Sequence, residues 1–145
     1  MREVATDMSN AVRSGPEAAA ALLAVSPELA HETSTGGATP LHMCCMTDAA
    51  QHSTPVLVAA AGVDLEARDT WGYTPIQRAA TNNLPVAAEA LINAGADHRS
   101  PSGREATGES ARELAQRLRS FGVIRAFQQW EIAQGLELPE GEFML

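Results

Sequence analysis

A chain of 145 residues is long enough to bury one hydrophobic core without help from a metal ion or disulfide bonds. Its formal net charge of −8 disfavours binding to nucleic acid or to anionic membranes, whereas a partner protein with a basic surface would be attracted. The only two cysteines, Cys44 and Cys45, are adjacent and cannot form the disulfide framework of a secreted protein.

Neither a leader nor a membrane-spanning segment is predicted. The first seven residues contain no apolar run after a basic start, so they are unlike a signal peptide. The longest apolar stretch, residues 18–25, is far shorter than a bilayer requires. These features favour a protein of the cytoplasm or the nucleus.

The first predicted unit covers residues 5–34 and contains two helices. Gly15 lies between them, because glycine tolerates the left-handed backbone conformation that ends a helix. Leu22 and Leu23 of the second helix are expected to face the core.

The second unit, residues 36–67, carries the motif Gly-Ala-Thr-Pro-Leu-His at residues 37–42. Thr39 precedes a proline, which suits the first position of a helix. The second helix is predicted at residues 56–60 and ends at Gly62. About two extra residues are inserted between the helices, near residues 49–53.

The third unit, residues 69–102, repeats the motif as Gly-Tyr-Thr-Pro-Ile-Gln at residues 72–77. Thr74 is expected to cap its helix by accepting a backbone hydrogen bond. Asn83 ends the first helix of this unit, and Gly95 ends the second.

The fourth unit, residues 104–134, keeps a weaker copy of the motif, with Gly108, Ser110 and Leu114 in register. A last helix is predicted at residues 123–133. Its Phe127 and Trp130 share a face, which is expected to close the stack. The tail, residues 135–145, mixes acidic and apolar residues, and the sequence leaves open whether it is a flexible motif or folds back.

This recurrence resembles the ankyrin repeat family, whose units of about 33 residues carry a Thr-Pro-Leu-His motif. The resemblance implies an all-α solenoid of stacked helix-turn-helix units joined by extended finger loops, with one repeat domain at residues 1–134. Degenerate terminal units are expected, because they face water on one side. The resemblance also implies that His42, and Gln77 in the next unit, bond to a neighbouring turn.

Catalytic and metal sites are not expected. His42, Cys44, Cys45 and His52 lack the spacing of a four-ligand zinc site, and buried free cysteines behave as small hydrophobic residues. His31 and the other finger histidine, His98, are far apart along the stack. The sequence contains no nucleophile elbow, phosphate loop or zinc-protease motif, so neither an enzyme nor a bound cofactor is predicted.

Trp71 and Tyr73 are the strongest candidates for binding a partner protein. The resemblance implies that partners contact the finger tips and the exposed face of the first helices, and Trp and Tyr dominate interface hot spots. The other candidates on this predicted face are Arg68, Thr70, Met46, Thr47, Thr81, Asn82 and Arg78. The alternative is that both aromatic rings pack locally. The longer finger at residues 97–107 is either a second binding loop or an insertion that a surface loop tolerates without a function.

The sequence therefore predicts a protein–protein interaction module, either an adaptor or a subunit of a larger assembly. The alternatives are a small regulatory or inhibitory binder and a substrate of a modifying enzyme. Ankyrin domains resembling this one can be hydroxylated at an asparagine just after the finger begins. Here Leu65 and Glu66, and His98 and Arg99, occupy those positions, which argues against modification.

Overall fold

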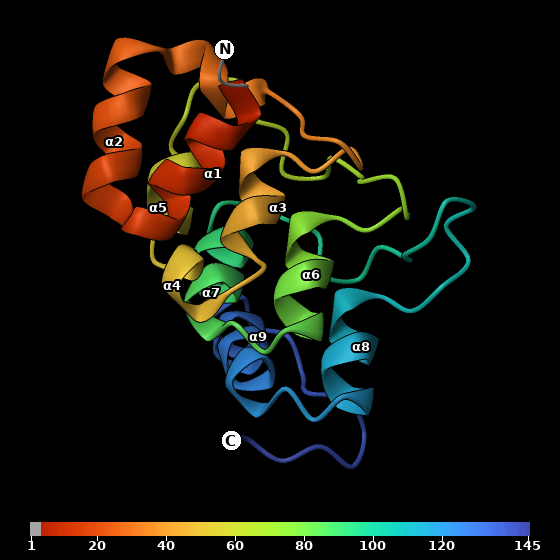
Figure 1. Ribbon diagram of the computed structural model, residues 1–145. Coiled ribbons are helices and arrows are strands. Elements are labelled where there is room, and N and C mark those ends of the chain that lie inside the picture. The colour runs from red at the N-terminus through yellow and green to blue at the C-terminus, as the bar shows by residue number, and fades with distance from the viewer. Residues whose placement is uncertain (1–3) are drawn as a thin grey trace.

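The computed structural model describes residues 4–145, and the predicted all-α repeat solenoid is confirmed (Figure 1). Residues 1–3, which belong to the start of the chain judged unlike a signal peptide, lie outside the described residues. Within residues 4–145, no helix is both long enough and apolar enough to cross a membrane.

Four helix pairs follow one another within residues 4–145. The inner helices are α1 (Val4–Ser14), α3 (Pro40–Cys44), α6 (Pro75–Thr81) and α8 (Ala111–Arg117). The outer helices are α2 (Pro16–Val25), α5 (Thr54–Val58), α7 (Pro85–Asn93) and α9 (Phe121–Ala133). The division into a repeat domain at residues 1–134 and a tail stays a prediction.

Each of the later inner helices starts at a hydroxyl side chain that caps it. Thr39, Thr74 and Ser110 each accept a hydrogen bond from the backbone N–H three residues further on. The side chain of that third residue in turn accepts from the backbone N–H of the capping residue, which makes a capping box. Local sequence therefore determines where these helices begin. The capping role predicted for Thr74 is confirmed.

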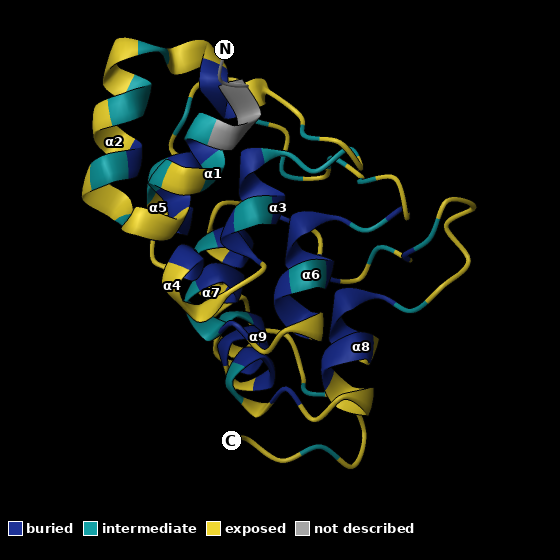
Figure 2. Cartoon of the chain, in the orientation of Figure 1, coloured by how far each residue is buried: buried dark blue, intermediate teal, exposed yellow. Residues whose placement is uncertain are grey.

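The helices form two rows that stack side by side. Each inner helix packs on the inner helix of the next pair, and each outer helix packs on the next outer helix. The facing sides of both rows are buried (Figure 2). Leu41, Ile76, Leu91 and Phe127, one or more from each of the last three pairs, have no exposed surface. This shared core explains why no single pair could bury its apolar face alone.

The insertion in the second unit forms helical structure of its own. It contains helix α4 (Asp48–Gln51), which begins where the side chain of Thr47 accepts from the N–H of Ala50 at 3.1 Å. A second short segment that the sequence did not suggest is the 3-10 helix η1 (Pro27–His31), after α2.

Leu22 and Leu23 lie at the edge of the core rather than inside it. Both are half-buried, whereas Leu91 and Ile92 of α7 are buried. The reason is position: α7 has a neighbour on both sides, but α2 is the first of the outer row.

Phe127 and Trp130 share a face of α9 that packs against the hydrophobic core, in agreement with the expectation that this face closes the stack. The same face also packs on the ring of His98 from the finger between the third and fourth pairs. The ring centres are 4.9 Å apart for Phe127 and 5.5 Å apart for Trp130. The face therefore also contacts the last finger, and the tail covers another part of α9, at Gln128.

The adjacent cysteines are packing residues of the second unit. Cys44 and Cys45 are free and fully buried. Burial raises the pKa of the Cys44 thiol to about 12 and that of Cys45 well above its usual value, so both are protonated at neutral pH. His42 is buried, whereas His52 is exposed. In the part of the chain that the structure describes, no three His, Cys, Asp or Glu side chains gather where they could hold a metal ion.

Candidate functional site

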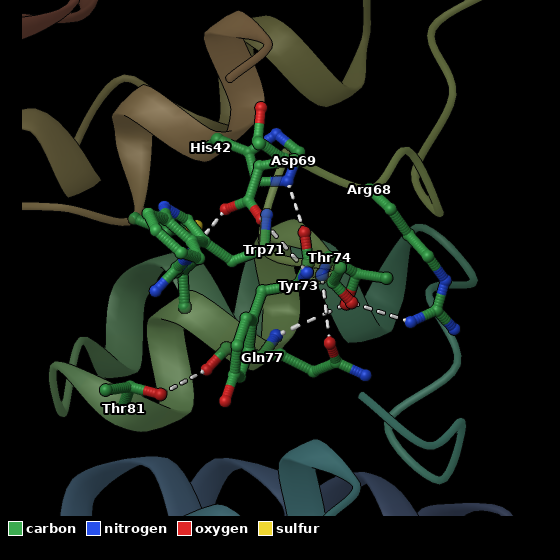
Figure 3. A network of polar contacts seen from close by, with 12 residues as sticks. His42, Arg68, Asp69, Trp71, Tyr73, Thr74, Gln77 and Thr81 are labelled. Atoms are coloured by element: carbon green, nitrogen blue, oxygen red, sulfur yellow. Dashed lines mark hydrogen bonds and ion pairs between the residues drawn. The ribbon is translucent and has the colours of Figure 1, made fainter. Parts of the chain in front are cut away.

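The tip of the finger that carries Trp71, residues 64–73, is shaped by one carboxylate. Asp69 Oδ1 accepts from the backbone N–H groups of Trp71 and Tyr73, each at 3.0 Å, and Asp69 Oδ2 accepts from Arg78 at 2.7 Å (Figure 3). Burial raises the pKa of Asp69, but the Tyr73 N–H and the Arg78 guanidinium outweigh it and hold that pKa below its usual value. Asp69 is therefore an anion at neutral pH and fixes the finger tip.

Gly72 lets this finger touch the next one. Its φ is 85°, and a Cβ there would lie 2.1 Å from the carbonyl carbon of Gly103. The close approach allows the Gly103 N–H to donate to the Gly72 carbonyl at 3.0 Å. On the other side, the Thr70 N–H donates to the carbonyl of Gly36 at 2.9 Å. Successive fingers are thus joined backbone to backbone.

Buried polar side chains tie each middle inner helix to the finger that follows it. His42 Nε2 donates to the Tyr73 carbonyl at 2.7 Å, and Gln77 Nε2 donates to the Ser100 carbonyl at 3.0 Å. The Thr39 N–H donates to His42 Nδ1 at 3.1 Å, so the imidazole proton lies on Nε2. Burial lowers the pKa of His42, which keeps the ring neutral. The bonds to a neighbouring turn that the resemblance implied for His42 and Gln77 are present.

Trp71 and Tyr73 lie differently on the finger. Trp71 is 66% exposed, whereas Tyr73 is half-buried. The guanidinium of Arg78 lies 4.4 Å from the centre of the Tyr73 ring, and that of Arg104 lies 6.0 Å from the centre of the Trp71 ring. Arg104 Nε also donates to the Thr70 carbonyl at 2.7 Å. The longer finger therefore folds back beside Trp71.

Two hollows flank Trp71 and Tyr73. The first, called here the Trp71 groove, has a volume of about 340 Å³ and lies between the finger and helices α6 and α8. Its lining residues are Trp71, Tyr73, Arg78, Thr81, Leu114, Arg117 and Leu118. The second hollow, of about 510 Å³, lies between Trp71 and the longer finger, whose Arg104 and Glu105 contribute to its lining.

Four of the predicted contact residues, Trp71, Tyr73, Arg78 and Thr81, line the Trp71 groove. Figure 3 shows Arg68 on the opposite side of the finger from the Trp71 ring and Thr81. There, Arg68 Nη1 donates to the Gly72 carbonyl at 2.8 Å, so this side chain stabilises the turn.

Thr70, Met46 and Asn82 are exposed but are not among the residues that line either hollow. Asn82 Nδ2 donates to the Cys45 carbonyl at 2.8 Å and so links the end of α6 to the end of α3. Met46, just beyond α3, is 53% exposed. A contact role for these residues and for Arg68 stays a prediction.

The groove also contains residues that were not singled out from the sequence. Arg117 and Leu118 occupy in α8 the register that Thr81 and Asn82 hold in α6, so the repeat spacing between Gly72 and Gly108 was a usable signal for them. Arg104, which lines the second hollow and not the Trp71 groove, has no such signal, because its place beside the Trp71 ring depends on how the longer finger folds.

A buried ionic cluster holds the longer finger against the last helix pair. Glu131 Oε2 accepts from His98 at 2.8 Å, from Arg99 at 2.9 Å and from Arg112 at 3.1 Å. Burial raises the pKa of Glu131, but hydrogen bonds from Arg112 and His98 outweigh it and hold that pKa below its usual value. Burial lowers the pKa of His98, so this ring is neutral and donates from Nε2.

The Trp71 groove offers a flat exposed aromatic ring, apolar side chains from α8 and guanidinium groups. Arg78 is neutralised by Asp69, and Arg117 bonds to Glu109 at 2.7 Å. On the other side of Trp71, at the second hollow, Arg104 bonds to a backbone carbonyl, so its charge is available to a carboxylate. Such a lining suits the side chains of another protein, with an aromatic anchor at its centre.

The family described as "Ankyrin repeats (3 copies)" matches residues 8–102 of the sequence. A comparison with curated proteins gave no match. The matched range covers well over half of the chain and contains both motifs, at residues 37–42 and 72–77. Helices α8 and α9 lie beyond it and continue the two helix rows. The chain belongs to the ankyrin repeat family.

Proposed function

We propose that this protein is an interaction module that holds a partner protein in the Trp71 groove, as an adaptor or as a subunit of a larger assembly. Ankyrin repeats are generally protein–protein interaction modules, and the family is typically non-enzymatic. The observation that carries the proposal is the exposure of Trp71 above an already built groove.

Trp71 is costly to leave in water unless something covers it. Its indole is 66% exposed, although Asp69 and the bonds between fingers hold its backbone in place. A partner that covers the ring gains apolar burial without first having to order the finger. Leu118, 41% exposed at the far side of the groove, offers a second apolar contact.

The charges of the protein indicate the partner's chemistry both over long distances and at the point of contact. The net charge of −8 attracts a basic partner surface from a distance. At the point of contact, Arg104 favours a carboxylate beside the apolar side chain that covers Trp71. The partner segment is therefore apolar with at least one acidic residue, on a protein whose remaining surface is basic.

A pull-down with matched variants tests this proposal. The wild-type chain, Trp71→Ala and Val25→Ala are immobilised and incubated with native extract, after circular dichroism has shown equal helix content. Val25 is the control because it is 82% exposed and apolar, but lies on α2 at the opposite end of the stack. A stoichiometric partner retained by wild type and Val25→Ala, but lost from Trp71→Ala, is expected. A partner retained equally by all three chains would contradict the proposal.

A further inference from the structure

The last ten residues of the chain fold back onto the end of the stack. Helix α9 ends in a turn in which Leu136 N–H donates to the Glu131 carbonyl at 2.9 Å and Gly135 has a φ of 79°. The tail then passes below α8 and α9 (Figure 1). A second turn, in which Glu142 N–H donates to the Pro139 carbonyl at 3.0 Å, brings residues 142–145 against α9.

Gln128 of α9 binds this segment through its whole side-chain amide. Its Nε2 donates to Glu142 Oε1 and to the Phe143 carbonyl, each at 2.8 Å. Its Oε1 accepts from the Leu145 N–H, also at 2.8 Å. Two of these three bonds go to the peptide backbone, so Gln128 recognises this segment largely independently of its side chains.

Arg112 of α8 supplies the charge that recognises Glu142. Its guanidinium is fixed by Glu131, to which Nε donates at 3.1 Å and Nη2 at 3.2 Å, and Nη2 also bonds to the Glu142 carboxylate. Arg112 is 6% exposed and Gln128 is fully buried beneath the tail. Two preoriented polar side chains on neighbouring helices thus bind the same tail segment.

The tail is attached through polar contacts and not through a hydrophobic core. Phe143 is 85% exposed, and Met144 and Leu145 are each about half exposed. A hollow of about 250 Å³ remains between the tail at residues 139–142 and the α8 side chains of Arg112, Glu113 and Gln116. Because little apolar surface is buried, little opposes the entropy that the tail regains on release.

We propose that Arg112 and Gln128 form a second peptide-binding cleft, which the chain's own residues 142–145 fill and from which a partner peptide of the same chemistry displaces them. The ligand is an extended segment with a glutamate, a bulky apolar residue directly after it, and a free backbone N–H three residues after the glutamate. The tail is a tethered competitor that lowers the apparent affinity of the cleft. This cleft is separate from the Trp71 groove and does not depend on its function.

The test uses the full chain and a fluorescein-labelled peptide of residues 138–145, with binding measured by fluorescence polarisation. In the variant Glu142→Gln/Leu145→Pro, the tail loses the carboxylate that Arg112 binds and the N–H that Gln128 accepts from, while the cleft is unchanged. We expect this variant to bind the peptide at least about tenfold more tightly than wild type, because the competitor is gone.

Two controls separate the cleft from general attraction to the peptide. Glu140→Gln removes the same charge from the same exposed tail and is expected to leave the affinity at the wild-type level. Adding Gln128→Ala to the tail variant is expected to abolish the gain, with unchanged circular dichroism. The proposal would be overturned if wild type and the tail variant bound the peptide with equal affinity. It would also be overturned if the tail variant bound a peptide with glutamine in place of Glu142 as tightly as it binds the unsubstituted peptide.

Discussion

The middle of the stack and its last helix pair are held to their fingers by different polar contacts. In the middle, one neutral side chain per repeat reaches one backbone carbonyl, as His42 does to Tyr73 and Gln77 does to Ser100. At the end, Glu113 occupies the same register but only caps its own helix. The ionic cluster around Glu131 instead joins the last pair to the finger before it, the same finger that Gln77 bonds through Ser100.

The difference follows from what comes after each helix pair. A middle helix pair is followed by a finger whose backbone carbonyl accepts one hydrogen bond from the inner helix. Within the described residues, the fourth pair is followed by the tail, and side chains from the preceding finger and from α8 converge on the Glu131 carboxylate of α9. Each contact repeated along the stack is a single hydrogen bond to a backbone carbonyl, whereas in the terminal cluster several bonds depend on the one residue Glu131.

The largest effect is expected from Glu131→Gln. The substitution keeps the shape of the side chain but removes the carboxylate that His98, Arg99 and Arg112 share, and leaves Arg112 paired only with Glu142 of the tail. Breaking a buried ion pair in this way costs about 3–5 kcal/mol. The free energy of unfolding, measured by urea denaturation, should fall by that amount. Glu137→Gln, at an exposed tail position, is the control and should have no effect. A loss below about 1 kcal/mol for Glu131→Gln would show that the cluster does not hold the last pair.

A smaller effect is expected in the middle of the stack. His42→Ala removes both the bond to Tyr73 and half of the capping box, which should cost about 1–3 kcal/mol in the same assay. His42→Gln should recover most of this loss, because Gln77 performs both tasks in the next repeat. If His42→Gln were as unstable as His42→Ala, the two repeats would not use equivalent contacts.

Both regions should lose stability as the pH falls. The folded-state pKa values of His42 and His98 lie below the usual histidine value because of burial, so their contribution is complete above about pH 6.5 and is lost as the pH falls through the lowered values. Glu131 and Asp69 also have lowered pKa values, so their contributions are present above about pH 4.5 and are lost in stronger acid. The urea midpoint should decrease from neutral pH downwards, and a midpoint that rises towards pH 5 contradicts this assignment. Between neutral pH and about pH 5, His42→Gln should show the smaller decrease.

The helix caps should respond alike in both regions. Thr74→Ala and Ser110→Ala each remove one side-chain bond to a helix N-terminus, and each should cost about 1 kcal/mol. Thr74→Ser, which keeps the hydroxyl, is the matched control. A cost several times larger at one site would mean that its hydroxyl does more than cap.

The smallest effect on stability is expected at the groove. Trp71→Ala should change the free energy of unfolding by no more than about 0.5 kcal/mol, because the indole is exposed and its backbone is held by Asp69. A larger loss in urea denaturation would support the alternative that the ring packs locally.

The repeated parts of this structure could be predicted from sequence, because the helix caps depend on residues close together in the chain and the contacts between repeats recur at the same motif positions. The threonine caps, the turn at Asn83 and the bridging roles of His42 and Gln77 all follow from their place in the motif. The same spacing could also have indicated Leu118 as a groove residue, because it lies in the register of Asn82.

The terminal cluster and the tail could not be predicted in this way. His98, Arg112 and Glu131 come from a finger and two helices, and nothing in their spacing indicates that they meet. The tail binds through backbone groups of Phe143 and Leu145, which carry no sequence signal. Their contacts depend on tertiary packing rather than on local pattern.

Site-specific photocrosslinking tests the central claim, that the Trp71 groove holds a partner, most directly. A photoreactive amino acid is placed at Leu118 inside the groove and, as a control, at the exposed residue Glu89 on outer helix α7. In native extract, the Leu118 probe should give one main adduct that excess wild-type chain suppresses and excess Trp71→Ala does not, and the Glu89 probe should not give it. An adduct suppressed equally by both competitors, or formed equally from Glu89, would contradict the account.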